Sequence, residues 1–140
     1  MRERMEMARS QQLNIVLYSF GFKYGFPVDV NMVLDVRFLP NPYWVPELQP
    51  LTGKVKKVAE YVLRSEAGLS FFVHLEPLLQ CIIEQNTTVG KKTVRIAVGC
   101  TGGRHRSVAV TEKIAAFLTE FPVELTVFHR DIERDGRVVD

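Results

Sequence analysis

The sequence predicts an α/β domain of three layers, with a mostly parallel sheet of four or slightly more strands and helices on both of its faces. Short runs rich in Ile, Val and Leu alternate along the chain with longer segments whose apolar residues recur at helical spacing. The runs are apolar at nearly every position, as in strands that are covered on both faces. The chain has 140 residues, of which 46% are hydrophobic, and this composition suits one domain with one core.

Four of the runs are predicted strands. The run from Leu13 to Phe20 (LNIVLYSF) is the most continuous, and Gly21 ends it. The others extend from 32 to 37 (MVLDVR), from 93 to 98 (TVRIAV) and from 123 to 129 (VELTVFH). We expect right-handed connections between the strands, whereas these patterns do not predict their order in the sheet.

Three segments between the strands are predicted helices because of the spacing of their apolar residues. They cover residues 54 to 64, a stripe from 71 to 83 and residues 108 to 118. Pro77 lies inside the second stripe, so that helix either bends there or begins a turn later than the stripe indicates. Cys81, in the same stripe, is predicted to be buried.

A proline-rich segment, residues 39 to 53 (LPNPYWVPELQPLTG), lies between the second strand and the first helix. It contains four of the seven prolines and is predicted to be a long extended loop. Long ordered loops in compact domains are usually functional. Tyr43 and Trp44 would either line a pocket or anchor this loop to the core.

Composition limits the classes of function. The net charge of +2 does not by itself indicate a nucleic-acid partner. The two cysteines do not make a disulfide framework, and reduced thiols suggest an intracellular setting. The N-terminus lacks the apolar region of a signal peptide, and no run approaches the ~18 apolar residues of a membrane span. We therefore expect a cytoplasmic protein with no membrane partner, no metal and no cofactor.

Polar residues follow each predicted strand, whereas the strand bodies are largely apolar. In open parallel sheets, ligands bind beyond the carboxyl ends of the strands. The sequence therefore predicts a ligand site at that edge. Outside the glycine-rich loop described next, the candidate ligand-binding residues are Ser19, Lys23, Asp35, Arg37, Asn41, Tyr43, His129 and Arg130.

The glycine-rich loop, residues 99 to 107 (GCTGGRHRS), follows the third strand and precedes a helix. Such a junction gathers backbone N–H groups and the positive end of a helix around one point, which suits an anion. Glycines permit close backbone approach and positive φ, and an arginine adds a fork that matches phosphate oxygens. The alternative is a turn with solvated basic residues. The predicted phosphate site comprises Cys100, Thr101, Gly102, Gly103, His105, Arg106 and Ser107.

The spacing of Cys100 and Arg106, with five residues between them, resembles the signature of cysteine-dependent phosphatases. In those enzymes a thiolate attacks phosphorus, and a helix N-terminus with basic neighbours lowers the pKa of the thiol. Asp35 or Asp131 could then serve as the general acid. Alternatively, the thiol is a passive wall of a binding site. The motifs of P-loop nucleoside triphosphatases and of dinucleotide-binding folds are absent.

Five segments in order resemble the C-terminal domain of the RapZ family: SFGFKYGFP (19–27), DVRFLPNPYW (35–44), LTG (51–53), GCTGGRHRSV (99–108) and FHRDIE (128–133). The resemblance covers residues 13 to 133, with a flexible lead-in predicted at 1 to 12 and a flexible tail at 134 to 140. It implies an α/β domain that binds an amino-sugar phosphate, glucosamine-6-phosphate. The ligand would contact Thr101, Gly102, His105 and Arg106, with Cys100 beside it.

The resemblance also implies small-RNA binding and an oligomeric adaptor role. This sequence departs from the family at Tyr43, where a histidine is expected, and in a tail that mixes acidic residues with arginines. It contains no Walker loop, so nucleotide binding would need a separately encoded partner. We expect a sensor or adaptor for a phosphorylated metabolite, or for inorganic phosphate or sulfate, rather than an enzyme. The alternatives are a phosphatase that uses Cys100, Arg106 and Asp35, and an RNA-binding module.

Overall fold

The computed structural model describes residues 12–134, so the predicted lead-in before Gln12 and the tail from 135 to 140 lie outside the described residues. The observed strands agree with the predicted ones to within a few residues. The elements are β1 (Leu13–Gly21), η1 (Phe22–Tyr24), β2 (Met32–Asp35), η2 (Pro42–Trp44), α2 (Lys56–Leu63), α3 (Glu66–Thr88), β3 (Thr93–Cys100), α4 (Arg106–Leu118) and β4 (Val123–His129).

The sheet has four parallel strands in the order β2-β3-β1-β4. This confirms the predicted α/β class and the parallel sheet. β1 and β3 are the inner strands. β1 has the most continuous apolar run of the chain and buries every residue from Leu17 to Gly21. The edge strands β2 and β4 alternate between half-buried and exposed residues instead.

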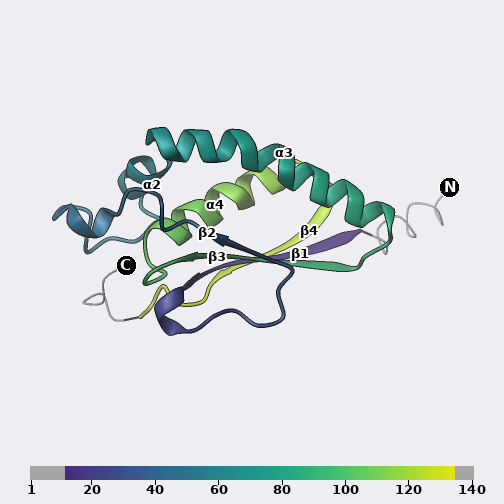
Figure 1. Ribbon diagram of the computed structural model, residues 1–140, viewed down its shortest axis with the longest axis horizontal. Helices are drawn as coiled ribbons and strands as arrows, with labels where there is room; N and C mark the ends of the chain where they lie inside the picture. Colours follow the sequence, from purple (N-terminus) through teal and green to yellow (C-terminus); the bar gives the residue numbers. More distant parts are fainter. Residues whose placement is uncertain (1–11, 135–140) are drawn as a thin grey trace.

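The prediction of helices on both faces is wrong, because α2, α3 and α4 all lie on one face (Figure 1). Right-handed connections explain the difference. The connections from β2 to β3 and from β3 to β4 cross the sheet in the same direction, so both place their helices on the same face. The connection from β1 to β2 crosses in the opposite direction and lies on the other face, where residues 22–31 form η1 and a loop (Figure 1).

The two faces of the sheet therefore carry cores of different size. The helical face buries alternate residues of β1, such as Leu13, Ile15 and Leu17, against α3 and α4. The opposite face has a small cluster in which Phe22 and Val30 of the loop pack on the sheet. The buried members of that cluster are Tyr18, Phe20 and Ala97.

Helix α3 runs without a break through Pro77, so the predicted later start is wrong. Its N-cap is Ser65, whose Oγ accepts a hydrogen bond from the backbone N–H of Gly68 at 3.0 Å. Pro77 is exposed, where the hydrogen bond that proline removes can be replaced by water. Cys81 is exposed, contrary to prediction, because Leu79 and Ile83 face the core and Cys81 falls on the opposite side of the helix.

By length and composition alone, α3 is also the one helix among residues 12–134 that could cross a membrane. The sequence predicted no membrane span because no run of apolar residues is long enough. In α3, Glu76 and Gln80 interrupt the apolar residues. The core helices of soluble proteins share this length and composition. The buried residues of α3 are Gly68, Phe72, Leu75, Leu79 and Ile83.

Candidate functional site

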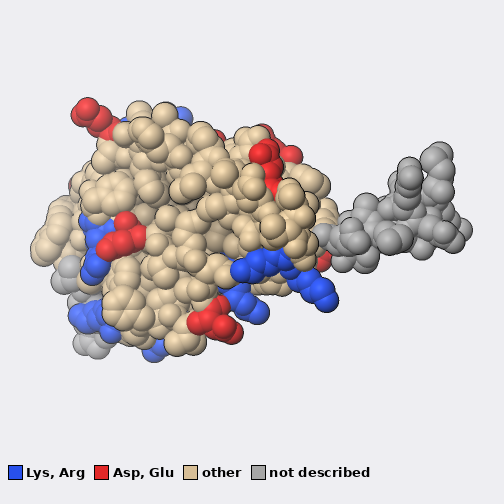
Figure 2. All heavy atoms as spheres, turned by 45° about the vertical axis from the view of Figure 1, so that its right-hand side comes forward, with Lys and Arg blue, Asp and Glu red and all other residues tan. Residues whose placement is uncertain are grey.

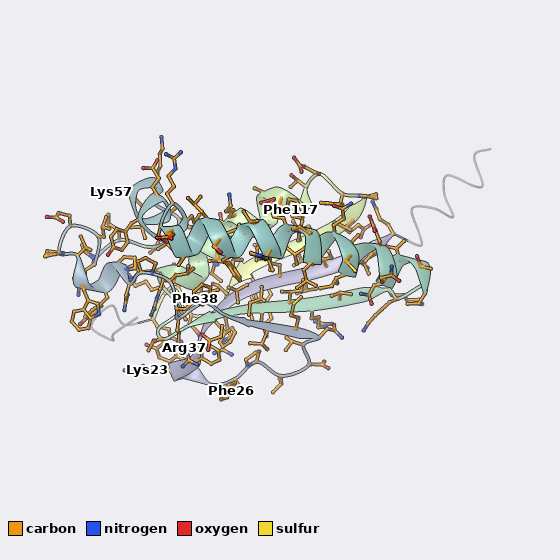
Figure 3. All side chains as sticks on the ribbon, turned by 45° about the horizontal axis from the view of Figure 1, so that its top comes forward. Lys23, Phe26, Arg37, Phe38, Lys57 and Phe117 are labelled. Atoms are coloured by element: carbon orange, nitrogen blue, oxygen red, sulfur yellow. The ribbon has the colours of Figure 1, made fainter. Side chains whose placement is uncertain are left out.

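The carboxyl ends of the four parallel strands meet at one edge, which we call the strand-end edge. Figure 3 shows Lys23 and Arg37, which follow β1 and β2, on this side of the sheet. The sequence predicted that these residues lie close together because ligand sites of parallel sheets lie at this edge. The fold brings them together there. The strand register places side by side Gly21 and Cys100, Ser19 and His129, and Asp35 and Gly99.

The glycine-rich loop connects β3 to α4 and packs directly on the end of β1. A Cβ atom on Gly21 would lie 2.4 Å from the carbonyl carbon of Gly102, so the two backbones are in contact. Gly103 has φ of +76°, the positive value predicted for a glycine of this loop. Gly102 and Gly103 are both buried. The loop backbone is therefore fixed at the N-terminus of α4 before any ligand binds.

The three consecutive basic residues of this loop hold the proline-rich segment and Arg37, which lies just before it. Arg106 donates from Nη1 to the carbonyl oxygen of Arg37 at 2.7 Å. His105 donates from Nε2 to the carbonyl oxygen of Gln49 at 3.0 Å, and Arg104 donates from Nη2 to that of Pro50 at 2.7 Å. From the sequence, these basic side chains were expected either to bind phosphate or to be solvated. Neither interpretation included hydrogen bonds to backbone carbonyl oxygens. Because carbonyl oxygens are acceptors only, these contacts fix the orientation of each side chain.

Cys100 ends β3 beneath the first turn of α4. Its side chain is fully buried, and its Sγ lies 3.1 Å from the Oγ of Ser107. Ser107 is also fully buried. A thiol next to a hydroxyl at a strand-to-helix junction has the arrangement that the phosphatase alternative requires, whereas its burial limits access by solvent.

Asp35 and Arg37 form a two-point ion pair at the open side of the edge. Arg37 donates from Nε to Oδ1 of Asp35 at 2.9 Å and from Nη2 to Oδ2 at 2.6 Å. The hydrogen bond from the guanidinium lowers the pKa of Asp35, and the same bond raises the pKa of Arg37. The guanidinium lies 4.1 Å above the ring of Phe22. Both charged side chains are almost half exposed, at 46% and 47%.

Asp131 and Arg130 form the buried counterpart of that pair. Asp131 accepts a hydrogen bond from the backbone N–H of Gly21 at 2.8 Å. It also forms an ion pair with Nη2 of Arg130 at 2.9 Å. Arg134 pairs with its other oxygen at 3.3 Å. Arg130 also donates to the carbonyl oxygen of Gly25 at 2.8 Å. These contacts hold the end of β1 in place, so the geometry does not favour Asp131 as a general acid or Arg130 as a ligand contact.

Ser19, His129 and Glu112 form a chain of hydrogen bonds across three elements. Nε2 of His129 lies 3.0 Å from Oε2 of Glu112, and Nδ1 lies 2.7 Å from Oγ of Ser19. Because a carboxylate only accepts, Nε2–H donates to Glu112, and the hydroxyl of Ser19 is the hydrogen-bond partner of Nδ1. Ser19 is fully buried, so it links β1 to β4 and α4 rather than facing a ligand. Sequence patterns missed Glu112, because they did not predict that β4 lies beside β1.

The remaining predicted residues have local roles. The Oδ1 of Asn41 accepts a hydrogen bond from the N–H of Tyr43 at 3.1 Å and caps η2. The ring of Tyr43 packs edge to face on Trp44, with centroids 4.9 Å apart. The backbone N–H of Lys23 donates to the carbonyl oxygen of Thr101 at 3.0 Å, which joins η1 to the glycine-rich loop. The side chain of Lys23 is exposed at the strand-end edge (Figure 3).

Comparison with known proteins matches the family described as the RapZ C-terminal domain to residues 13–133. A nucleotide-binding protein of Streptomyces coelicolor is 51% identical over 124 residues, which are 89% of this chain and 42% of that protein. A nucleotide-binding protein of Lactiplantibacillus plantarum is 43% identical over 138 residues, which are 99% of this chain and 47% of that protein. The chain thus spans less than half the length of these relatives.

Proposed function

The chain belongs to the RapZ C-terminal domain family, and we propose that it is a sensor or adaptor domain that binds an amino-sugar phosphate at the strand-end edge. The relatives are named for nucleotide binding, but this chain covers only 42% of the Streptomyces coelicolor protein and lacks a Walker loop. A phosphorylated metabolite is therefore a better-supported ligand for this domain than a nucleotide.

The observation that carries the proposal is the position of the Asp35–Arg37 pair beside a fixed glycine-rich loop. The loop and the N-terminus of α4 suit a phosphate group, because they offer backbone N–H groups and a positive helix end. Arg37 is half exposed and supplies a guanidinium, and Asp35 supplies a carboxylate that suits the ammonium of an amino sugar. A ligand that carries a phosphate and an ammonium group could replace Asp35 and Arg37 as each other's partners. The desolvation penalty would be small, because both side chains are already almost half exposed.

Calorimetric titration tests this proposal with glucosamine-6-phosphate, inorganic phosphate and glucosamine. We expect saturable binding of the sugar phosphate, weaker binding of phosphate alone and none of glucosamine. Arg37→Gln should weaken sugar-phosphate binding at least about tenfold, the loss expected for a charge-assisted hydrogen bond. Arg64→Gln, at the exposed C-cap of α2, is the matched control and should bind as the unaltered protein does.

Arg106→Ala is a second variant, since its guanidinium also holds the carbonyl of Arg37. We expect it to lose binding while the far-ultraviolet circular dichroism spectrum shows retained secondary structure. If the folded, unaltered protein binds neither the sugar phosphate nor phosphate, the proposal is wrong. RNA would then be the next ligand to test, although acidic side chains are interspersed among the basic ones on the face shown in Figure 2.

A cysteine-dependent phosphatase is the second candidate, favoured by the 3.1 Å contact between Cys100 Sγ and Ser107 Oγ. It predicts hydrolysis of p-nitrophenyl phosphate that Cys100→Ser abolishes. A sensor instead predicts no hydrolysis and unchanged sugar-phosphate affinity in Cys100→Ser. Measuring both quantities on the same variant separates the two functions.

A further inference from the structure

An apolar groove lies between the edge strand β2 and the N-terminal half of α3, outside the glycine-rich loop and its ligand candidates. Its cavity volume is about 480 Å³, and its lining carries no Lys, Arg, Asp or Glu. The ring of Phe38 forms one wall, packs edge to face on Phe71 at 5.3 Å and is 55% exposed (Figure 3). The lining residues are Leu34, Phe38, Ala67, Ser70, Phe71, His74, Leu75 and Leu78.

A second hollow continues the groove toward the carboxyl end of β2. It has a volume of about 650 Å³ and shares Phe38, Ala67 and Ser70 with the first. Among residues 12–134, Glu66 is the only Lys, Arg, Asp or Glu that lines either hollow. From Ser65 to Leu78 the helix rises about 20 Å, which matches an extended segment of about six residues.

The backbone beside this groove is the open edge of the sheet. β2 is the outermost strand on its side among residues 12–134. The N–H of Val36, directly after β2, donates to the carbonyl oxygen of Gly99 on β3 at 2.9 Å. Alternate residues direct their backbone groups to the same side of a strand, so Met32 and Leu34 direct theirs to β3, and Val33 and Asp35 direct theirs to the open edge. An added strand could pair with these groups.

We propose that the β2 edge and the adjoining groove bind an extended segment of a partner protein, which adds a fifth strand to the sheet. The segment has apolar residues at alternate positions, because one face of a strand beside β2 points into an uncharged groove. It has a Lys or Arg at the end that lies against Glu66, the single charge of the two hollows. Backbone pairing supplies affinity, and the two hollows supply specificity.

A random octapeptide library selected against the purified chain provides the probe. We expect peptides with alternating apolar residues and one basic end. The best of them is then synthesised in two forms, each N-methylated on alternate residues along one of its two edges. Methylation of the edge that faces β2 should abolish binding, whereas methylation of the other edge should leave the affinity unchanged, because only one edge donates hydrogen bonds to a neighbouring strand.

Two tryptophan variants on α3 locate the site. Ser70 is exposed and lines both hollows, so Ser70→Trp fills them and should weaken peptide binding at least about tenfold. Gln80 is exposed on the same helix and lines neither hollow, so Gln80→Trp is the matched control and should bind normally. Glu66→Lys should reverse the preference for a basic end.

Three results would overturn the proposal. One is a library that yields no binding peptide. Another is peptide binding that Ser70→Trp or both methylated forms leave unchanged. The third is a dimer of the unaltered chain in sedimentation experiments that Ser70→Trp converts to monomers, which would assign the edge to a second copy.

Discussion

The strand-end edge has an inner and an outer half, and their charged groups are used differently. In the inner half, Asp131 is fully buried and is held by the Gly21 N–H, Arg130 and Arg134. In the outer half, Asp35 has Arg37 as its ion-pair partner, and both side chains are almost half exposed. A buried carboxylate cannot give up its partners without a large desolvation penalty, whereas an exposed one exchanges them readily. The inner half therefore fixes the loop backbone, and the outer half is available to a ligand.

The largest expected effect comes from separating the two backbones of the inner half. In Gly21→Ala, the new Cβ would meet the Gly102 backbone at 2.4 Å, and neither main chain can move aside easily. Overpacking of this kind destabilises a protein by about 3 kcal/mol. Gly21 has φ of −107°, which alanine adopts freely. The loss of stability would therefore report only the steric clash with the Gly102 backbone and no backbone strain.

Gly90→Ala is the control for that variant. Nothing lies within 4 Å of a Cβ at Gly90, but its φ is +75°. The backbone strain there should reduce stability by about 1 kcal/mol. Urea unfolding followed by circular dichroism measures both. Equal losses in the two variants would mean that the loop is not pressed against β1.

Asp131→Asn tests the buried charge itself. It keeps an acceptor for the Gly21 N–H but leaves Arg130 and Arg134 without their carboxylate. Arg130 is partly exposed and recovers some hydration, so we expect a loss of about 2 kcal/mol rather than the full penalty of a broken buried pair. The same unfolding experiment measures it. A loss below that of Gly90→Ala would show that Asp131 does not fix the edge.

Sequence patterns predicted the outer half better than the inner one. Asp35 and Arg37 are two residues apart, so their pairing follows from local geometry. The Asp131 contact with Gly21 joins residues that are 110 positions apart, and it depends on a strand order that periodicity does not encode. For the same reason, the sequence did not predict the hydrogen bond from Arg106 to the carbonyl oxygen of Arg37.

The fold shows the same division. Runs of apolar residues located all four strands, because strand bodies are specified locally. The placement of α2, α3 and α4 on one face followed from the direction of each crossover, and that direction also requires the strand order. Cys81 was assigned to the wrong side of α3, because a stripe of seven apolar residues does not define which neighbours share its face.

Ser19→Ala examines the hydrogen-bond chain that connects the inner half to α4. The variant leaves Nδ1 of His129 without the hydroxyl that lies 2.7 Å away, in a nearly buried position. The expected loss of stability is about 1 kcal/mol. A double-mutant cycle with Glu112→Gln checks the connection, because residues in one hydrogen-bond network couple. Strict additivity of the two substitutions would show that His129 does not link them.

Asp35→Asn should have the smallest effect on stability, since exposed ion pairs contribute little. The pKa of Asp35 is lowered from 3.8 in the folded chain, mainly by the hydrogen bond from Arg37. Its stabilising contribution is therefore present above that pH and is lost as the pH falls through the folded pKa. The variant should lack this part of the decline in acid stability, whereas Glu47→Gln, another exposed carboxylate in the same part of the chain, should retain it.

The effect of Asp35→Asn on binding should be larger than its effect on folding, and this contrast separates the two halves of the edge. The variant removes the carboxylate proposed to meet the ammonium of an amino sugar, so glucosamine-6-phosphate affinity should fall about tenfold. Glucose-6-phosphate has no ammonium, and its affinity should change much less. Calorimetry at neutral pH measures both ligands on the same protein. If both affinities fall equally, Asp35 acts by orienting Arg37 toward the phosphate, because loss of the ion pair at 2.6 Å would then affect any phosphate ester alike.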